Sequence, residues 1–429
     1  MSFKADFHIH SHYSRATSKE MNIISLAKWG QLKGLNVIGT GDFTHPKYFQ
    51  EIQDTLEPAE EGLFKLKKEF EKDLAKEIPA SCKNEMRFML SVEISSIYKK
   101  NDKVRKTHNL IIAPKLEYAA KIISKLNKIG NLKSDGRPIL GLDAKKLLEI
   151  VLNVSEECML IPAHIWTPHF SVFGSMSGFD SLEECFEDLT PYIYALETGL
   201  SSDPAMNWRW SKINNLTLIS NSDAHSARKL GREANVFNTD LSYDAITKAL
   251  RNNDLKAFEA TIEFFPEEGK YHLDGHRNCQ IRLSPKESIK NNYLCPKCCK
   301  KVTIGVMHRV EKLADKPKNF KPNQARPFYS IIPLPEIIAE VFKSTVKSKK
   351  VEQMYQNMLE KLGNEFKILL DARIDDIQKA SNSMIAEGIN RMRLGQIQIK
   401  AGYDGEFGTV NIFSDEEKNS TLGKQATLF

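Results

Sequence analysis

The chain has 429 residues, more than one ordinary hydrophobic core supports, so we expect two or three domains. Its hydrophobic content of 41% suits a globular protein, no apolar run approaches the roughly 20 residues that span a bilayer, and the first residues do not resemble a signal sequence, so we expect a cytoplasmic protein with no membrane partner. The formal net charge of +6 permits a nucleic-acid partner without requiring one.

Short apolar runs alternate with helix-period segments over residues 1–263, which we expect to form the first domain. Candidate helices span residues 23–32, 63–75, 119–126, 144–151, 182–188 and 243–250. About seven strand-helix repeats predict a largely parallel sheet, and the length favours a closed α/β barrel over an open sheet.

Polar side chains that bind metals recur at the edges of these apolar runs. D-F-H-I-H places His8 and His10 two residues apart, and S-N-S-D-A-H-S does the same for Asp223 and His225, so in a strand each pair shares one face. Other runs end or begin at Asp42, Glu93, His108 and His164. We expect two or three divalent ions, zinc, magnesium or manganese, held by His8, His10, Glu93, His108, His164, Asp223 and His225, with Asp42, Glu93 and Asp223 as catalytic residues.

The order of these motifs resembles the polymerase and histidinol phosphatase (PHP) superfamily. The resemblance covers roughly the first 260 residues and implies a distorted seven-stranded barrel with a multi-metal centre for phosphoester hydrolysis. Two positions depart from the family pattern: S-R-A-T-S stands where an acidic residue or His is usual, and Phe43 follows Asp42 where a His is usual. His12 or His45 could complete a metal position there.

A small zinc-binding module is expected over residues 264–325. Seven Cys, three of them in C-P-K-C-C, favour metal binding over a disulfide framework. Cys295 and Cys298 can hold one side of a tetrahedral structural zinc, and we favour Cys279 and His308 as the second pair. Cys299, His276 and His272 are the alternatives.

The remaining sequence predicts a helical DNA-binding domain over residues 326–410 and a flexible tail over 411–429. Basic runs between residues 302 and 350 favour contact with a phosphate backbone. G-Y-D-G-E-F-G could let the main chain approach a phosphate or base, or could form only a turn. The final K-Q-A-T-L-F resembles part of a sliding-clamp-binding box, in which Gln425, Leu428 and Phe429 would dock onto a PCNA-type ring.

Over residues 3–410 the order of the segments is similar to the endonuclease Q family. The resemblance rests on I-H-S-H-Y-S-R-A-T-S-K-E-M, E-G-K-Y-H-L-D-G-H-R-N-C, I-G-V-M-H-R-V-E-K-L-A-D and I-I-P-L-P-E-I-I-A-E. It implies nicking on the 5′ side of a deaminated base (hypoxanthine, uracil or xanthine) or abasic site in DNA, leaving 3′-hydroxyl and 5′-phosphate ends, by a nucleoid-associated repair enzyme.

A damaged base inside a duplex must be extruded before a protein can read it. For contacts to DNA we expect Arg15, Ser175, Arg209 and Arg228. The competing functions are a small-molecule phosphatase of the PHP type and a proofreading 3′-5′ exonuclease.

Overall fold

The first part of the chain is built around one large sheet. The computed structural model describes residues 2–414 and 416–417. The sheet has 11 strands, in the order β15-β12-β11-β1-β2-β5-β4-β3, with β6, β7 and β8 joined to it through β5 and β6. They are β1 (Ser2–Asp6), β2 (Val37–Gly39), β3 (Leu56–Pro58), β4 (Phe64–Leu66), β5 (Arg87–Lys100), β6 (Lys103–Ala113), β7 (Ile139–Leu140), β8 (Met159–Pro162), β11 (Ala234–Asn238), β12 (Phe258–Glu263) and β15 (Phe328–Ser330).

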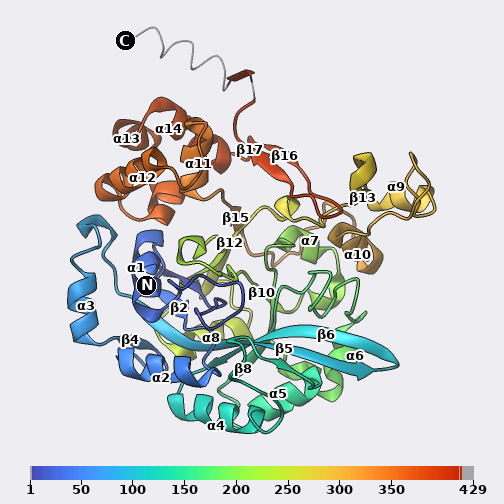
Figure 1. Cartoon of the computed structure of the whole chain (residues 1–429), viewed down its shortest axis with the longest axis horizontal. Coiled ribbons are helices and arrows are strands. Elements are labelled where there is room, and N and C mark those ends of the chain that lie inside the picture. The colour runs from blue at the N-terminus through green and yellow to red at the C-terminus, as the bar shows by residue number, and fades with distance from the viewer. Residues whose placement is uncertain (1, 415, 418–429) are drawn as a thin grey trace.

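The sheet is mixed, so the expectation of a largely parallel sheet was wrong. β1–β2 and β2–β5 are parallel, but β1–β11, β11–β12, β5–β6 and β6–β8 are antiparallel. β5 and β6 form a long hairpin that pairs from Leu90↔Ala113 to Lys100↔Lys103 and projects from the body in Figure 1. A separate parallel pair consists of β9 (Ala195–Glu197) and β10 (Thr217–Ile219).

Helices cover the outside of this sheet (Figure 1). They are α1 (Ile23–Lys33), α2 (Pro46–Thr55), α3 (Lys68–Leu74), α4 (Leu116–Leu126), α5 (Ala144–Leu152), α6 (Leu182–Phe186), α7 (Pro204–Trp208) and α8 (Tyr243–Arg251). Four of the expected helices are confirmed as α1, α4, α5 and α8. The range 63–75 was wrong at its start, because Phe64–Leu66 is a strand, and the range 182–188 continues as a 3₁₀ helix over Glu187–Tyr192.

Local sequence explains how these elements begin and end. Asn22 caps α1 by accepting a hydrogen bond from the Ser25 amide, and Gly34 ends it with a φ of 92°, a conformation that glycine adopts without steric cost.

In β5 the run F-M-L-S-V-E-I is buried throughout. Because successive side chains alternate between faces and both faces are covered, Glu93 enters the protein interior together with its apolar neighbours.

The segment after β12 forms a small module with little apolar core. It contains β13 (Asp274–His276), β14 (Ile281–Leu283), α9 (Pro285–Lys290) and α10 (Val306–Leu313). Its buried cluster consists of Leu283, Cys295 and Val302. Such a core is too small to stabilise a fold alone, which is the usual reason for a structural metal.

A helical group follows, seen at the top left of Figure 1. It contains α11 (Leu334–Val341), α12 (Lys349–Leu362), α13 (Ile374–Ala380) and α14 (Ser383–Arg393), with a π-helical turn over Lys367–Asp371. An α/β barrel, a Cys/His module and a helical C-terminal region are therefore all present, and the expected fold class is confirmed.

Residues on both sides of the helical group return to other parts of the molecule. β15 pairs with β12 of the large sheet, from Thr261↔Phe328 to Glu263↔Ser330. After α14 the hairpin of β16 (Gln398–Lys400) and β17 (Thr409–Asn411) lies against the small module, where the Gly402 amide donates to the Glu267 carbonyl at 2.7 Å. The domain boundaries at 263, 325 and 410 stay a prediction.

Two expectations concern other parts of the chain. Among residues 2–414 and 416–417, no helix combines the length and apolar character that a membrane span requires. The expected clamp-binding residues Gln425, Leu428 and Phe429 lie outside the described residues.

Candidate metal centres

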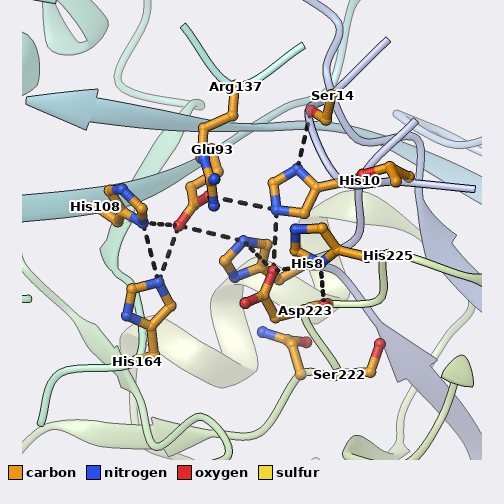
Figure 2. A network of polar contacts seen from close by, with 12 residues as sticks. His8, His10, Ser14, Glu93, His108, Arg137, His164, Ser222, Asp223 and His225 are labelled. Carbon is orange, nitrogen blue, oxygen red and sulfur yellow. Dashed lines mark hydrogen bonds and ion pairs between the residues drawn. The ribbon is translucent and has the colours of Figure 1, made fainter. Parts of the chain in front are cut away.

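Six side chains from distant parts of the sequence meet inside the barrel (Figure 2). One group brings ligand atoms of His8, His10, Glu93 and Asp223 within 4.8 Å of one another, and a second does so for Glu93, His108 and His164. His8 and His10 follow β1, Glu93 and His108 lie in β5 and β6, and His164 and Asp223 follow β8 and β10. The expected convergence of these six residues is thus seen in the structure.

Glu93 belongs to both groups. Its Oε1 lies 2.6 Å from His108 Nδ1, 3.0 Å from His164 Nε2 and 3.6 Å from His8 Nε2. Its Oε2 lies 3.4 Å from His10 Nε2. Glu93 therefore contacts members of both groups and would be shared by cations held in them.

The unsatisfied atoms of the site fit divalent cations. Both carboxylate oxygens of Glu197 lie 3.0 Å from His8 Nδ1, so that nitrogen donates to Glu197 and Nε2 is the ring atom that faces the centre of the site. His8 Nε2 is buried without a hydrogen-bond partner and faces Asp223 Oδ1 at 3.7 Å as well as Glu93. Together with these two carboxylates, Nε2 offers the ligand atoms that a divalent cation would take in a carboxylate–His–metal arrangement.

The electrostatics of the site agree with this fit. Burial alone would raise the pKa of Glu93, but His108 and His8 hold it well below its usual value. Burial would likewise raise the pKa of Asp223, yet its hydrogen bond with His10 and the charge of His8 keep it low. Both carboxyl groups therefore stay ionised in the interior, where negative charge needs a positive partner.

Three residues of the site hold a left-handed backbone that non-glycine residues rarely adopt. The φ angles are 44° at Asp42, 29° at His164 and 46° at Asp223. Such strain persists only where the surrounding structure enforces it, and it concentrates at functional sites. Two of the three, His164 and Asp223, belong to the candidate ligand groups.

Asp42 supports the site and does not face its centre. Its Oδ1 lies 3.2 Å from His10 Nδ1, and its Oδ2 accepts hydrogen bonds from the amide of Ser11 at 2.6 Å and the hydroxyl of Ser14 at 2.8 Å. In this structure Asp42 positions His10, and its expected catalytic role stays a prediction.

Among the described residues, three other histidines that were expected to bind metal in the barrel belong to neither ligand group. His225 packs its ring against His10 at 4.5 Å and contacts the Asp223 carbonyl, outside both ligand groups. His12 approaches the Met21 carbonyl, and His45 stacks on Tyr13. None of these three histidines completes a metal position in this arrangement.

Glu197 and Arg137 were not among the expected residues. Glu197 also accepts from the His164 amide at 2.8 Å and from Asn221 Nδ2 at 2.8 Å, so it connects three of the loops. Arg137 Nη1 lies 3.1 Å from Glu93 Oε2, and about a quarter of its side chain is exposed, 26%. Glu197 ends the apolar run A-L-E, the same signal that identified Glu93, whereas Arg137 lies in a loop with no pattern that marks it.

The four expected DNA contacts lie in different surroundings. Arg15 is 76% exposed and pairs with Asp135, and Ser175 is exposed in a loop after β8. Arg228 covers the Trp29 ring and pairs with Glu352 at 2.6 Å. Arg209 is buried and paired with Glu311, so a phosphate contact from Arg209 is corrected to a structural ion pair.

A second site gathers three thiols and one imidazole in the small module. His276, Cys279, Cys295 and Cys298 present ligand atoms within 4.8 Å of one another, and all seven cysteines of the chain are free. Burial raises the pKa of Cys295, but the amides of Lys297 and Cys298 outweigh it and lower that pKa to about 7. A thiolate-rich tetrahedral set of this kind suits zinc.

The residue that joins the three thiols in this structure is His276, one of the alternatives, and not His308. His308 Nδ1 donates to Asp274 Oδ2 at 2.7 Å, and Asp274 Oδ1 accepts from the Gly305 amide at 2.7 Å. His308, a residue of α10, is thereby held to Asp274 of β13 and lies outside the thiol group. Cys299 and His272 lie outside the group as well.

Two family models and two curated proteins match parts of the chain. A model described as the MJ0043 C-terminal domain matches residues 333–396, and one described as PHP-associated matches residues 205–255. The protein MJ0043 of Methanocaldococcus jannaschii is 34% identical over 254 residues, 57% of this chain and 31% of that protein, so the chain spans about a third of its length. YqxK of Bacillus subtilis is 28% identical over 311 residues, 71% of this chain and 73% of that protein.

Two solved structures match almost the whole chain. The lesion-specific endonuclease PfuEndoQ from Pyrococcus furiosus has a TM-score of 0.83 at 30% identity, over 98% of this chain and 99% of that one. An endonuclease Q complex with a 27-mer duplex carrying an abasic lesion at the active site has a TM-score of 0.82 at 30% identity, over 97% and 98%. With this coverage and identity, and with its metal-ligand groups in place, the chain belongs to the endonuclease Q family of metal-dependent DNA endonucleases.

Proposed function

We propose that the protein is a DNA-repair endonuclease that hydrolyses the phosphodiester bond 5′ to a deaminated base (hypoxanthine, uracil or xanthine) or an abasic site, leaving 3′-hydroxyl and 5′-phosphate ends. The observation that carries the proposal is the convergence of His8, His10, Glu93, His108, His164 and Asp223 on one buried point. A related endonuclease Q holds an abasic-lesion duplex at its active site, which supports DNA as the substrate.

The two ligand groups would hold two or three divalent ions, with zinc, magnesium or manganese all compatible with imidazole and carboxylate ligands. When bound, such ions lower the pKa of water and neutralise charge on a reacting phosphate. His276, Cys279, Cys295 and Cys298 would hold one structural zinc.

The side chains of the barrel would orient the reaction. Glu93 lies between the ligand groups and fixes their spacing, and Asp42 and Glu197 hold the rings of His10 and His8. Arg137, partly open to solvent beside Glu93, can direct its guanidinium at a phosphate oxygen of the substrate. No serine, cysteine or threonine nucleophile would be required if the bound ions supply water as the nucleophile.

Lesion recognition would combine extrusion of the damaged base with backbone contacts. Mispaired deaminated bases leave the stack at lower cost than normal pairs, which favours them as substrates. Arg15, exposed beside the metal-site loop, and the exposed loop at Ser175 are the proposed contacts from the barrel. A PCNA-type clamp bound through Gln425, Leu428 and Phe429 would keep the enzyme with chromosomal DNA inside the cell.

The direct test uses an end-labelled duplex with a central deoxyinosine, compared with an unmodified duplex, a single strand and a small phosphomonoester. Internal nicking at the lesion that requires divalent metal and stops with chelator is the expected result. Trimming from an end would indicate a proofreading 3′-5′ exonuclease instead. Release of phosphate from the monoester alone would indicate a PHP-type phosphatase.

Asp223→Asn should abolish nicking while the protein still binds the lesion duplex, because the substitution removes a ligand charge at the centre of the site. Asp240→Asn, at an exposed position away from the ligand groups, is the matched control and should nick at the wild-type rate. Retention of full nicking by Asp223→Asn would contradict the assignment of the centre.

A further inference from the structure

Two buried glutamates lie opposite each other on neighbouring strands of the large sheet. Glu263 is the last residue of β12, and Glu233 directly precedes β11. The antiparallel register of these strands pairs Ala234 with Ile262, so the next step of the ladder sets Glu233 opposite Glu263. Side chains at directly opposite positions share one face of the sheet, with Cβ atoms about 5 Å apart. Both residues are fully buried, and we call them the carboxyl pair.

The nearby guanidinium group of Arg232 is directed away from the carboxyl pair. Its Nε and Nη2 donate to the Ser222 carbonyl at 2.9 and 2.8 Å. Glu233 Oε2 and Glu263 Oε1 are buried without a hydrogen-bond partner among the described residues. Two ionised carboxylates that are this close and this poorly compensated repel each other, so the pair favours keeping a proton.

The contacts of Thr198 point to Glu263 as the member that carries the proton. Thr198 Oγ1 lies 3.1 Å from the Ile219 carbonyl and 3.1 Å from Glu263 Oε2. A hydroxyl group has one hydrogen to donate, and a carbonyl can only accept. Both contacts are hydrogen bonds only if Glu263 is neutral and donates to Thr198 Oγ1.

The charged groups around the carboxyl pair are mostly acidic. Glu197 at the end of β9 and Asp203 at the start of α7 face it, and Arg232 is the cation that opposes them. Burial, together with the charge of Glu263, raises the pKa of Glu233 well above its usual value. Burial also raises the pKa of Glu263, and Asp203 adds to that shift. These surroundings agree with the protonation that the contacts indicate.

The carboxyl pair supports two loops that carry metal-site residues. One loop begins with Thr198, which directly follows Glu197 and its contacts with the metal ligands. The other begins with Ser220, whose hydroxyl donates to the Ile262 carbonyl of β12 at 2.7 Å, and continues to Asp223. A change in the charge of the pair therefore acts on both loops at once.

We propose that the carboxyl pair is a pH-sensitive support of the metal centre, which keeps a proton at neutral pH and loosens both loops when that proton is lost at alkaline pH. Loss of the proton ends the hydrogen bond from Glu263 to Thr198 and places a second negative charge beside the first. Protonation of the pair is independent of the substrate, whereas its effect on nicking rests on the proposed endonuclease function.

Stability should fall as the pH rises through the neutral range. Glutamates of an unfolded chain ionise near pH 4.3, about the value of a free side chain, whereas the folded pair stays protonated to higher pH. The stability that this proton contributes is fully present below about pH 4.3 and is lost as the pH rises through the folded pKa. For one extra proton in the folded state, the folding equilibrium constant falls about tenfold per pH unit.

The first test compares the wild type with Glu233→Gln/Glu263→Gln by urea unfolding at several pH values from 6 to 8, with metals bound. All other titratable groups are common to both proteins, so the ratio of their folding equilibrium constants isolates the pair. The ratio of double variant to wild type should rise about tenfold or more per pH unit. Glu259→Gln, at a half-exposed glutamate of the same strand, is the matched control and should give a constant ratio.

Infrared absorption gives a readout that requires no unfolding. A protonated carboxyl group has a C=O stretching band separate from the bands of a carboxylate. The difference spectrum of wild type minus double variant should contain this band at pH 7 and lose it at alkaline pH. Over the same pH range the wild type should lose nicking of a deoxyinosine duplex before the double variant does. If the double variant does not fold, Glu263→Gln alone provides the comparison.

A ratio that stays constant with pH, or a difference spectrum at pH 7 without the band, overturns the proposal. A ratio that falls with pH would show that the pair holds a cation in place of the proton, which overturns it too. Equal alkaline loss of nicking in both proteins overturns the effect on the metal centre. If neither protein nicks at any pH while the ratio rises, the proposed function fails and the protonated pair stands, so the two failures are distinguishable.

Discussion

At the scale of single residues, Glu197 connects the metal ligands to the protein around them. It binds His8 Nδ1, the His164 amide and Asn221, so it fixes one ligand ring and two loops. We expect Glu197→Gln to weaken metal binding about 10–100-fold, because such outer carboxylates orient the ligand and raise its basicity. Titration of nicking rate against metal concentration measures the shift.

Two measurements distinguish weaker metal binding in Glu197→Gln from a general loss of folded protein. At saturating metal the Glu197→Gln rate should recover, since the ligands themselves are intact. Glu183→Gln, at an exposed position of α6, should titrate like the wild type. If the metal concentration at half-maximal nicking is the same in Glu197→Gln and in the wild type, metal binding by His8 does not depend on its contact with Glu197.

The residues of the site divide into those that the sequence marks and those that it does not. Six ligands were predictable because each stands at the edge of a short apolar run, and the ends of neighbouring strands meet. Glu197 also stands at the end of an apolar run, but its strand has only three residues, which is too short for its pattern to be recognised in the sequence. Arg137 was not predictable, because its contact with Glu93 depends on the path of a loop.

At the scale of elements, the small module places two histidines near its cysteines in the sequence in different surroundings. His276 lies with the three thiols, and His308 is bound to Asp274. His276→Ala should therefore lose zinc and lower the melting temperature, whereas His308→Ala should keep its zinc. Zinc content by atomic absorption, measured on both purified variants, decides the point. Loss of zinc from His308→Ala alone would restore the original assignment.

The turn between α12 and α13 depends on one guanidinium group. Arg393 in α14 donates to the carbonyls of Ile368, Leu369 and Ala372 at 2.7–2.8 Å, at the end of the π-helical turn. We expect Arg393→Lys to cost about 1.5–3 kcal/mol of unfolding free energy, because an ammonium group cannot reproduce this planar fork although it keeps the charge.

Urea unfolding followed by circular dichroism measures this loss. Arg373→Lys is the matched control: its side chain is 80% exposed and pairs only loosely with Asp375 at 3.7 Å, so its cost should stay within about 0.5 kcal/mol. Equal stability of Arg393→Lys and the wild type would mean that water replaces the three contacts.

Helices were predictable from the sequence where apolar residues recur with strong helical spacing, and less predictable where they do not. α1, α4, α5 and α8 carry caps or clear apolar faces. α2 was missed, since P-K-Y-F-Q-E-I-Q-D-T offers only three buried residues, Tyr48, Ile52 and Thr55. The prediction of a largely parallel sheet was wrong for a different reason. The alternation of strands and helices does not reveal a hairpin such as β5–β6, in which both strands are apolar.

At the scale of the whole molecule, the contacts between parts could not be predicted from local pattern. Pairing of β15 with β12 joins residues separated by almost the whole small module, and the β16–β17 hairpin returns to residues 267–269. Periodicity describes one element at a time, and these contacts depend on where the elements have been placed.

A buried ion pair joins the barrel to the helical group. Lys33 Nζ of α1 lies 2.7 Å from Glu365 Oε2, and the two side chains are 5% and 4% exposed. The same carboxylate accepts from Tyr355 Oη at 2.8 Å and the Leu334 amide at 3.0 Å. Glu365 thus organises the helical group and holds it to the barrel.

Removing only one charge of this ion pair should therefore lower the free energy of unfolding far more than removing both charges. Lys33→Ala leaves the Glu365 charge buried and unpaired, for which we expect a loss of about 3–5 kcal/mol. Lys33→Met with Glu365→Gln leaves no buried charge and should cost much less. Trp29, whose ring lies 6.5 Å from that of Tyr355 across the same contact, reports the separation by fluorescence during urea unfolding. A loss below about 1 kcal/mol in Lys33→Ala would show that the barrel and the helical group are held together by apolar packing alone.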